Sequence, residues 1–115
     1  MLKQILNEFL SIDGVIAAAL IGYDGFVIEI IQTDFVDADA LGALCSGSIR
    51  FFEHGGRVMD MGHPRQIALE YQGGTIVLTP ITSEEFLVIL TRTSTGLGHL
   101  NYTLPKISSR IRALI

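Results

Sequence analysis

The sequence has one cysteine, Cys45, and no tryptophan. A lone thiol excludes an internal disulfide and any metal centre built from several cysteines. Only 17% of the residues are charged, the net charge is -4, and the eight Lys and Arg residues are scattered. Binding to a phosphate backbone depends on clustered basic side chains, so the sequence argues against a nucleic-acid-binding protein. We also expect no cofactor.

The sequence also lacks an uninterrupted apolar run of the roughly 18 to 20 residues that cross a bilayer, so we expect no membrane span. Its first residues include Glu8 and no small-residue cleavage site, which is unlike a signal peptide. With the single cysteine, these features predict a cytoplasmic protein. Apolar residues are abundant at 49%, with a mean hydropathy of +0.46. A single domain over residues 1–115 cannot hide so much apolar surface, which favours self-association.

The chain is organised around a predicted β-hairpin at residues 14–31. Its first strand, residues 15–22, has no polar side chain, so helices are expected to cover both of its sides. Its second strand is predicted at residues 26–31. Asp24-Gly25 between them predicts a two-residue type I′ turn, which needs positive φ at both central residues.

Three segments have helical periodicity. Residues 2–12 form a short amphipathic helix, and Asp37 is the predicted N-cap of a longer middle helix that ends at residues 54–56. The last helix is predicted to begin at residues 93–95, with a kink or break at Pro105. The expected sheet-facing residues of the middle helix are Leu41, Leu44, Cys45, Ser48 and Phe52.

Glycines in the interior of the middle helix point to a close helix–helix contact. Gly42 lies with Ile49 on one flank, and Gly47 lies with Phe51 on the other. Each glycine costs the helix about 1 kcal/mol relative to alanine, a cost usually tolerated where something approaches closely. We therefore expect the middle helix to pack against another helix along a flank of small residues.

Three further strands follow. Residues 65–72 alternate, with Ile67, Leu69 and Tyr71 on one side and Gln66, Ala68 and Glu70 on the other, which is typical of an edge strand. Residues 75–80 and 86–91 are more apolar, and the second of these is expected to be central. The predicted fold is an α-β-β-α-β-β-β-α sandwich, a five-stranded antiparallel sheet with the terminal helices on one face and the middle helix on the other.

No group of residues predicts catalysis, so we expect the protein not to be an enzyme. His54, His63 and His99 lie on different elements, where a loop or surface role competes with metal binding. Cys45 is either a nucleophile or a buried small side chain, and its place on the core face favours burial. Glycines at residues 55–56 and 96–98 either bind an anion or end helices, and neither segment completes a phosphate-loop motif.

The chain resembles the Roadblock family, the dynein-light-chain-roadblock type of domain, and especially its prokaryotic MglB-like members. The similar features are Gly14-Val15 with Ala18-Ala19-Leu20-Ile21, and Asp24-Gly25 with Phe26-Val27-Ile28. Further along they are residues 76–80 and 86–91, and Gly96-Leu97-Gly98 at the last helix. The resemblance covers nearly the whole chain and implies the profilin-like Roadblock fold.

The resemblance implies a homodimer whose edge strands pair across a two-fold axis, with the middle helices side by side. The expected interface residues are Gly42, Gly47, Ile49, Arg65, Ile67, Ala68, Leu69 and Tyr71. It also implies a small Ras-like GTPase as partner, docked on the two-helix layer, where Arg50, Glu53 and His54 are candidate contacts or simply a solvated helix face. One alternative is an adaptor in a motility or transport assembly, and another is a small-ligand sensor or enzyme that uses a pocket under the middle helix.

Overall fold

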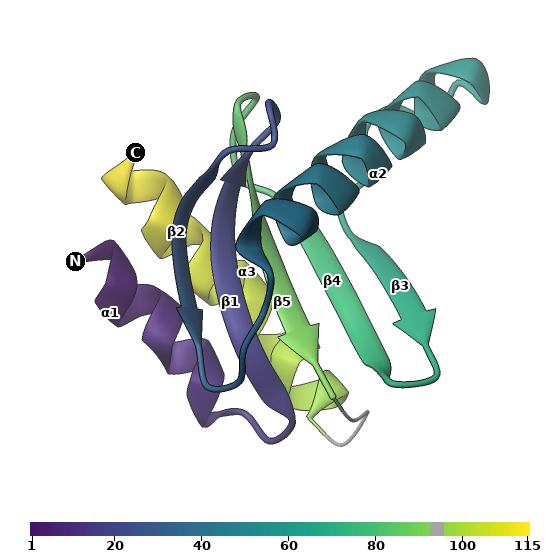
Figure 1. Cartoon of the computed structure of the whole chain (residues 1–115). Coiled ribbons are helices and arrows are strands. Elements are labelled where there is room, and N and C mark those ends of the chain that lie inside the picture. The colour runs from purple at the N-terminus through teal and green to yellow at the C-terminus, as the bar shows by residue number, and fades with distance from the viewer. Residues whose placement is uncertain (93–95) are drawn as a thin grey trace.

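The computed structural model describes residues 1–92 and 96–115, and its centre is a five-stranded antiparallel sheet (Figure 1). The spatial order is β2-β1-β5-β4-β3, which confirms the predicted sheet and the central place of β5. The first predicted strand, residues 15–22, has its predicted bounds, and the other four differ from the prediction by one or two residues at one or both ends. The strands are β1 (Val15–Gly22), β2 (Val27–Gln32), β3 (Ile67–Tyr71), β4 (Gly74–Pro80) and β5 (Glu85–Thr91).

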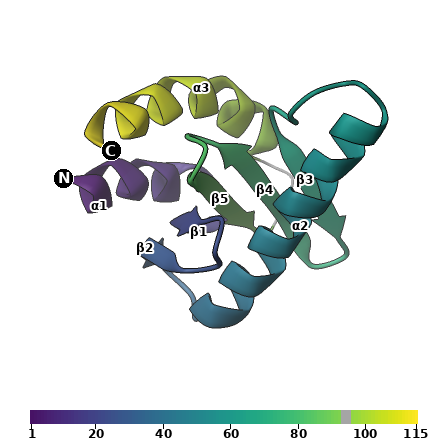
Figure 2. The same cartoon turned by 90° about the horizontal axis from the view of Figure 1, so that it is seen from above.

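Helices cover both faces of the sheet, as predicted. Helices α1 (Leu2–Asn7) and α3 (Leu97–Leu114) lie on one face, and α2 (Ala38–Val58) crosses the other (Figure 2). The first helix is shorter than expected, because residues 8–11 form a 3₁₀ turn. Within the described residues no helix has the length and apolar character of a bilayer span. The predicted cap at residues 93–95 lies outside the described residues.

Strand β1 is buried along its whole length, which explains why it has no polar side chain. Alternate residues feed two separate apolar clusters. Leu20 packs with residues of α1 and α3 such as Ile107, whereas Ile21 packs with residues of α2 such as Cys45. The prediction that β1 needs a helix on each side is therefore confirmed.

The β1–β2 turn differs from the prediction. Gly25 donates from its N–H to the Gly22 carbonyl at 2.9 Å, and Phe26 donates to the Asp24 carboxylate at 3.0 Å. Only Gly25 has a positive φ, of 92°, whereas a type I′ turn needs one at Asp24 as well. The Asp24 side chain closes a local turn with the backbone instead, so the connection is longer than two residues.

Helix α2 begins as predicted, with the Asp37 carboxylate accepting a hydrogen bond from Ala40 N at 3.1 Å. The predicted end at residues 54–56 is wrong, because the helix continues to Val58 and stops before Asp60, whose φ is 57°. Gly56 serves a different purpose from a cap. A Cβ there would lie 1.9 Å from the Gly62 carbonyl oxygen, so glycine allows the following loop to fold back onto the helix.

The buried face of α2 is rotated from the predicted one. Leu44 and Phe52, expected against the sheet, are exposed, and Ser48 is only half-buried. The reason is Gly42, where a Cβ would lie 2.3 Å from the Gly25 carbonyl oxygen, so the small-residue side of the helix meets the β1–β2 turn. The residues of α2 that are buried are Leu41, Gly42, Cys45, Ser46 and Ile49.

Helix α3 runs unbroken through Pro105, so the predicted division of this helix is wrong. Proline removes one backbone donor from the helix. On both sides of it, Leu104 and Ile107 are buried in the same apolar cluster, and this packing keeps the two halves of the helix on the sheet.

Gly42→Ala should destabilise the protein, because the new methyl group meets backbone rather than a movable side chain. We expect the free energy of unfolding to fall by about 1–3 kcal/mol, the usual cost of overpacking. In the matched control, Gly98→Ala, the new methyl group meets no atom within 4 Å, so stability should stay equal or rise by up to about 1 kcal/mol. Urea denaturation at one protein concentration measures both, and equal effects would contradict the role given to Gly42.

Candidate functional site

The outer side of α2 carries an unusual amount of exposed apolar surface. Phe51 is 68% exposed, and its ring meets that of Phe52 edge to face at 5.3 Å. The C-terminal half of the helix projects beyond the sheet (Figure 1). Contiguous apolar surface of this kind marks an interaction site. We call this surface the α2 apolar strip, and it consists of Leu44, Phe51, Phe52, Val58 and Met59.

Strand β3 is an open sheet edge close to this strip. It pairs with β4 on one side only. Ile67 and Leu69 face α2 and join the apolar cluster beneath it, whereas Ala68 is exposed. Tyr71 is exposed as well, because it lies at the hairpin end of the strand, beyond the cover of the core. An uncovered edge of this kind presents free backbone donors and acceptors to another strand.

The predicted interface residues on α2 fall into two groups. Ile49 has no exposed surface, and Gly42 packs against Gly25 of its own chain. Both therefore belong to the domain's own core, and the prediction that they contact a second helix is wrong. Gly47 is different, because it is exposed and has open space where a Cβ would lie.

The three predicted partner contacts also differ from one another. Arg50 donates from Nη1 to the Tyr23 carbonyl oxygen at 2.5 Å, and Glu53 accepts a hydrogen bond from the Tyr23 hydroxyl at 3.1 Å. The Glu53 carboxylate is also 3.7 Å from Nδ1 of His63. Arg50 and Glu53 thus hold the β1–β2 turn onto α2. Of the three, His54 is the exposed side chain that takes no part in these bonds.

Tyr23 is the residue that sequence reasoning missed. Its ring packs edge to face on Phe86 at 5.4 Å, and its hydroxyl bonds to Glu53. Partial burial, followed by the negative charge of Glu53, raises the pKa of Tyr23 to about 12. Only the neutral phenol can donate this hydrogen bond, so protonated Tyr23 links the turn to α2.

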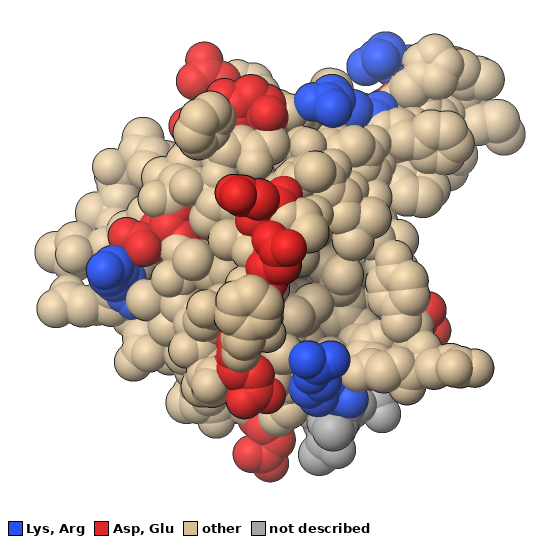
Figure 3. Space-filling model, viewed as in Figure 1, with Lys and Arg blue, Asp and Glu red and all other residues tan. Residues whose placement is uncertain are grey.

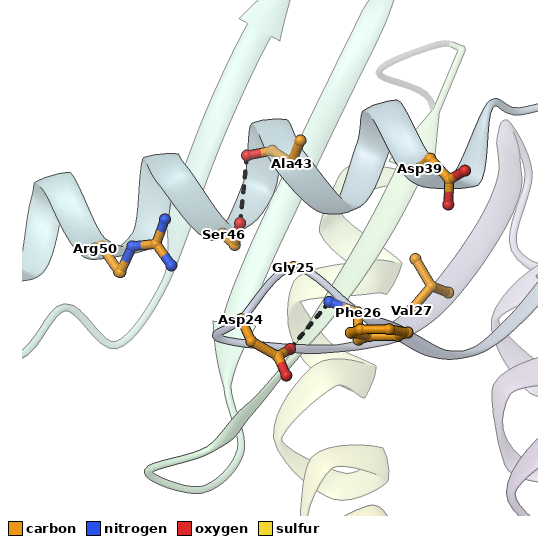
Figure 4. Close-up of a pocket in the computed structure, with 8 residues that line it drawn as sticks. All are labelled: Asp24, Gly25, Phe26, Val27, Asp39, Ala43, Ser46 and Arg50. Carbon is orange, nitrogen blue, oxygen red and sulfur yellow. Dashed lines mark hydrogen bonds between the residues drawn. The ribbon is translucent and has the colours of Figure 1, made fainter.

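A cavity of about 610 Å³ lies between the β1–β2 turn and α2. Asp24 and Phe26 from the turn, and Asp39 and Arg50 from the helix, surround it (Figure 4). Figure 3 shows acidic side chains over this side of the molecule. The Ser46 hydroxyl donates to the Ala43 carbonyl of its own helix at 3.3 Å, so it is not activated by a base. The cavity lies beside the middle helix, near the pocket expected for a small ligand, but its residues do not pair a nucleophile with a base.

Cys45 lies on the buried face of α2 and has no exposed surface, and burial raises the pKa of its thiol to about 12. A neutral thiol without access to solvent is a poor nucleophile. Among residues 1–92 and 96–115, no three His, Cys, Asp or Glu side chains come together as metal ligands do. The remaining features of this region are the α2 apolar strip and the open β3 edge.

The sequence matches the Roadblock/LC7 domain family over residues 1–91. The chain belongs to this family. Two uncharacterized proteins of Methanocaldococcus jannaschii are each 27% identical over 114 residues, which is 99% of this chain and 99% of theirs.

Solved structures share the fold of this Roadblock domain. A Roadblock/LC7 domain from Streptomyces avermitilis has a TM-score of 0.87 and 22% identity, covering 96% of this chain and 94% of that one. MglB of Myxococcus xanthus has a TM-score of 0.88 and 15% identity, covering 96% and 91%. The resemblance read from the sequence is therefore confirmed.

Tyr23→Phe should remove the tie between the turn and Glu53 and lower stability by about 1 kcal/mol at neutral pH. The pKa of Tyr23 in the folded protein, about 12, is above the ordinary tyrosine pKa of 10.0. The stability that the Tyr23–Glu53 hydrogen bond contributes is thus fully present below pH 10 and is lost as the pH rises from 10 to 12. Urea denaturation across this range should show that loss in the wild type and not in Tyr23→Phe. Tyr102→Phe, at an exposed phenol on α3, is the control and should retain the loss.

Proposed function

We propose that this Roadblock domain is a homodimeric regulator or docking platform for a small Ras-like GTPase. The observation that supports it best is the α2 apolar strip beside the free β3 edge. One surface offers apolar side chains and the other offers backbone hydrogen-bonding groups. A two-fold axis along β3 would bring each surface against its own copy, which is how symmetric dimers form.

In such a dimer the two β3 strands join the two sheets into one, and the α2 helices lie side by side on it. Pairing covers the exposed edge, and the α2 apolar strip loses its contact with water. Gly47 lies on the exposed side of α2, where its missing side chain would let two helices approach closely. A solved MglB structure is described as having a tetrameric arrangement, which supports self-association of this fold.

The paired helices would form the docking layer for the GTPase. His54 is an exposed polar residue of α2 that takes no part in the bonds to the β1–β2 turn, so it is free to contact a partner there. The described residues offer no activated nucleophile, so the domain acts on the partner by binding. Family resemblance supports a mechanism in which the GTPase's own residues carry out hydrolysis and the Roadblock dimer holds them in place.

Phe51→Glu should break the dimer, because it places a charge in the centre of the α2 apolar strip. The cost at such an apolar contact is about 2 kcal/mol, or roughly a thirtyfold higher dissociation constant. Ala68→Pro, on the β3 edge, should also impair association more than folding. The matched control is Phe26→Glu, at a phenylalanine that is 77% exposed on the β1–β2 turn. Light scattering across a dilution series measures all three, and an intact dimer in both Phe51→Glu and Ala68→Pro would refute the proposed interface.

A Ras-like GTPase encoded beside the gene should bind the wild-type domain with an affinity that depends on its nucleotide. We expect the dissociation constants of the GTP-loaded and GDP-loaded forms, measured by calorimetry, to differ at least about fivefold. This is the lower end of typical coupling between two binding sites. His54→Ala should weaken binding about tenfold, whereas His99→Ala, at an exposed histidine on α3, should not. Equal affinity in both nucleotide states would contradict a regulator and favour an adaptor.

A further inference from the structure

A second cavity, of about 510 Å³, lies on the face of the sheet opposite α2. Its walls are the middle of α3, the end of β4 and the residues that lead into β3. Figure 2 shows α3 on this face, with the whole sheet between it and α2. The cavity is therefore separate from the α2 apolar strip and from the cavity beside the β1–β2 turn.

The cavity is cationic in a protein whose net charge is -4. Its lining includes the guanidinium groups of Arg65 and Arg112 and the imidazole of His63, and no carboxylate. Among the described residues neither arginine is in an ion pair. The Glu53 carboxylate, 3.7 Å from Nδ1 of His63, lines the neighbouring cavity.

Arg112 is fixed at this cavity by its own hydrogen bond. Its Nε donates to the Ile81 carbonyl oxygen at 2.8 Å, which leaves the two terminal nitrogens of the guanidinium for a ligand. A planar guanidinium held in one orientation matches two oxygens of a phosphate or carboxylate group. Arg65 also lines the cavity, from the segment before β3, and its side chain is exposed.

Two hydroxyl groups at this cavity lack the partners that buried polar groups normally have. Thr79 Oγ1 and Ser108 Oγ are buried, and neither has a hydrogen-bond partner among the described residues. Ser108 as a residue is only 4% exposed. Both residues line the cavity. Unpartnered hydroxyls inside proteins are rare, and a ligand with oxygen acceptors in this cavity would give both of them a partner.

We propose that this cavity binds the phosphate group of a small anionic ligand. The arginines supply the charge. The hydroxyls of Ser108 and Thr79, which are buried without a partner among the described residues, turn toward the ligand and donate to phosphate oxygens. Phosphate suits this set better than a carboxylate, because it offers more oxygen acceptors to donors that approach from several sides. The volume exceeds that of one phosphate ion, and Leu104 supplies an apolar wall for the rest of an organic phosphate.

The test measures binding of three phosphate sources to the full chain by calorimetry and by thermal unfolding. The sources are inorganic phosphate, glycerol 3-phosphate, and phosphatidylcholine vesicles with and without phosphatidic acid. We expect saturable binding and a higher melting temperature with at least one of them. A response to the soluble compounds identifies a soluble ligand, and a response only to phosphatidic acid vesicles identifies a lipid headgroup. No response to any of the three overturns the proposal.

Two variants assign the binding to this cavity. Arg65→Gln should weaken it at least about tenfold, because it removes one charge-assisted contact. Ser108→Ala should also weaken it, yet in phosphate-free buffer it should keep or raise the melting temperature, because it deletes an unpartnered buried hydroxyl. This opposite response separates a ligand contact from a structural role.

The control is Arg92→Gln, at an exposed arginine outside the cavity. It removes the same charge and should leave phosphate binding unchanged. Binding that is reduced equally in Arg92→Gln and Arg65→Gln would show a general effect of net charge. Binding that persists in both Arg65→Gln and Ser108→Ala would place the anion elsewhere, and either result overturns the proposal.

Discussion

The contact between Gly42 of α2 and the Gly25 carbonyl of the β1–β2 turn sets the arrangement of the rest of the molecule. No side chain fits between these two backbones, so the helix meets the turn directly. This close approach determines which side of α2 faces the sheet. Leu44 and Phe51 are consequently turned to solvent, although they are as apolar as the residues that are buried.

The same contact is strengthened by side chains that also belong to the proposed docking helix. Arg50 and Glu53 both reach back to Tyr23, so two of the charged residues of α2 are used to hold the helix rather than to meet a partner. The domain therefore presents an α2 surface that is mainly apolar on its outer side. Such a surface suits a second copy of the chain better than solvent, and it leaves His54 for a further partner.

The sheet could be predicted from the sequence because a strand that is buried on both of its sides consists of apolar residues alone. An apolar β1 needs helices on both faces, and the alternation from Ile67 to Tyr71 identifies an edge. The rotation of α2 could not be predicted in the same way. A helical wheel shows that Gly42 lies on a small-residue flank but not whether its neighbour is another helix or a turn of the same chain. Periodicity favoured Leu44 and Phe52 as core residues, and the steric contact at Gly42 overrode it.

The candidate sites were harder to predict for a related reason. Ser108 reads as an ordinary polar residue of an amphipathic helix, and only the folded chain shows it buried without a partner at the same cavity as Thr79. Arg65 is distant in sequence from Arg112, and the sheet brings them to one cavity. Chemistry that depends on convergence of separate elements leaves no local pattern to read.

Contacts on both faces of the sheet hold strand β3 in place. An edge strand needs such support if it is to present a regular edge to a partner. On the α2 side, Ile67 is buried in the apolar cluster. On the α3 side, Gln66 donates from Nε2 to Asn101 Oδ1 at 3.2 Å, immediately before the strand begins. Without these contacts a five-residue edge strand with one neighbour would fray, because short two-stranded pairings are weak by themselves. The packing of both helix layers thus supports the open edge at β3.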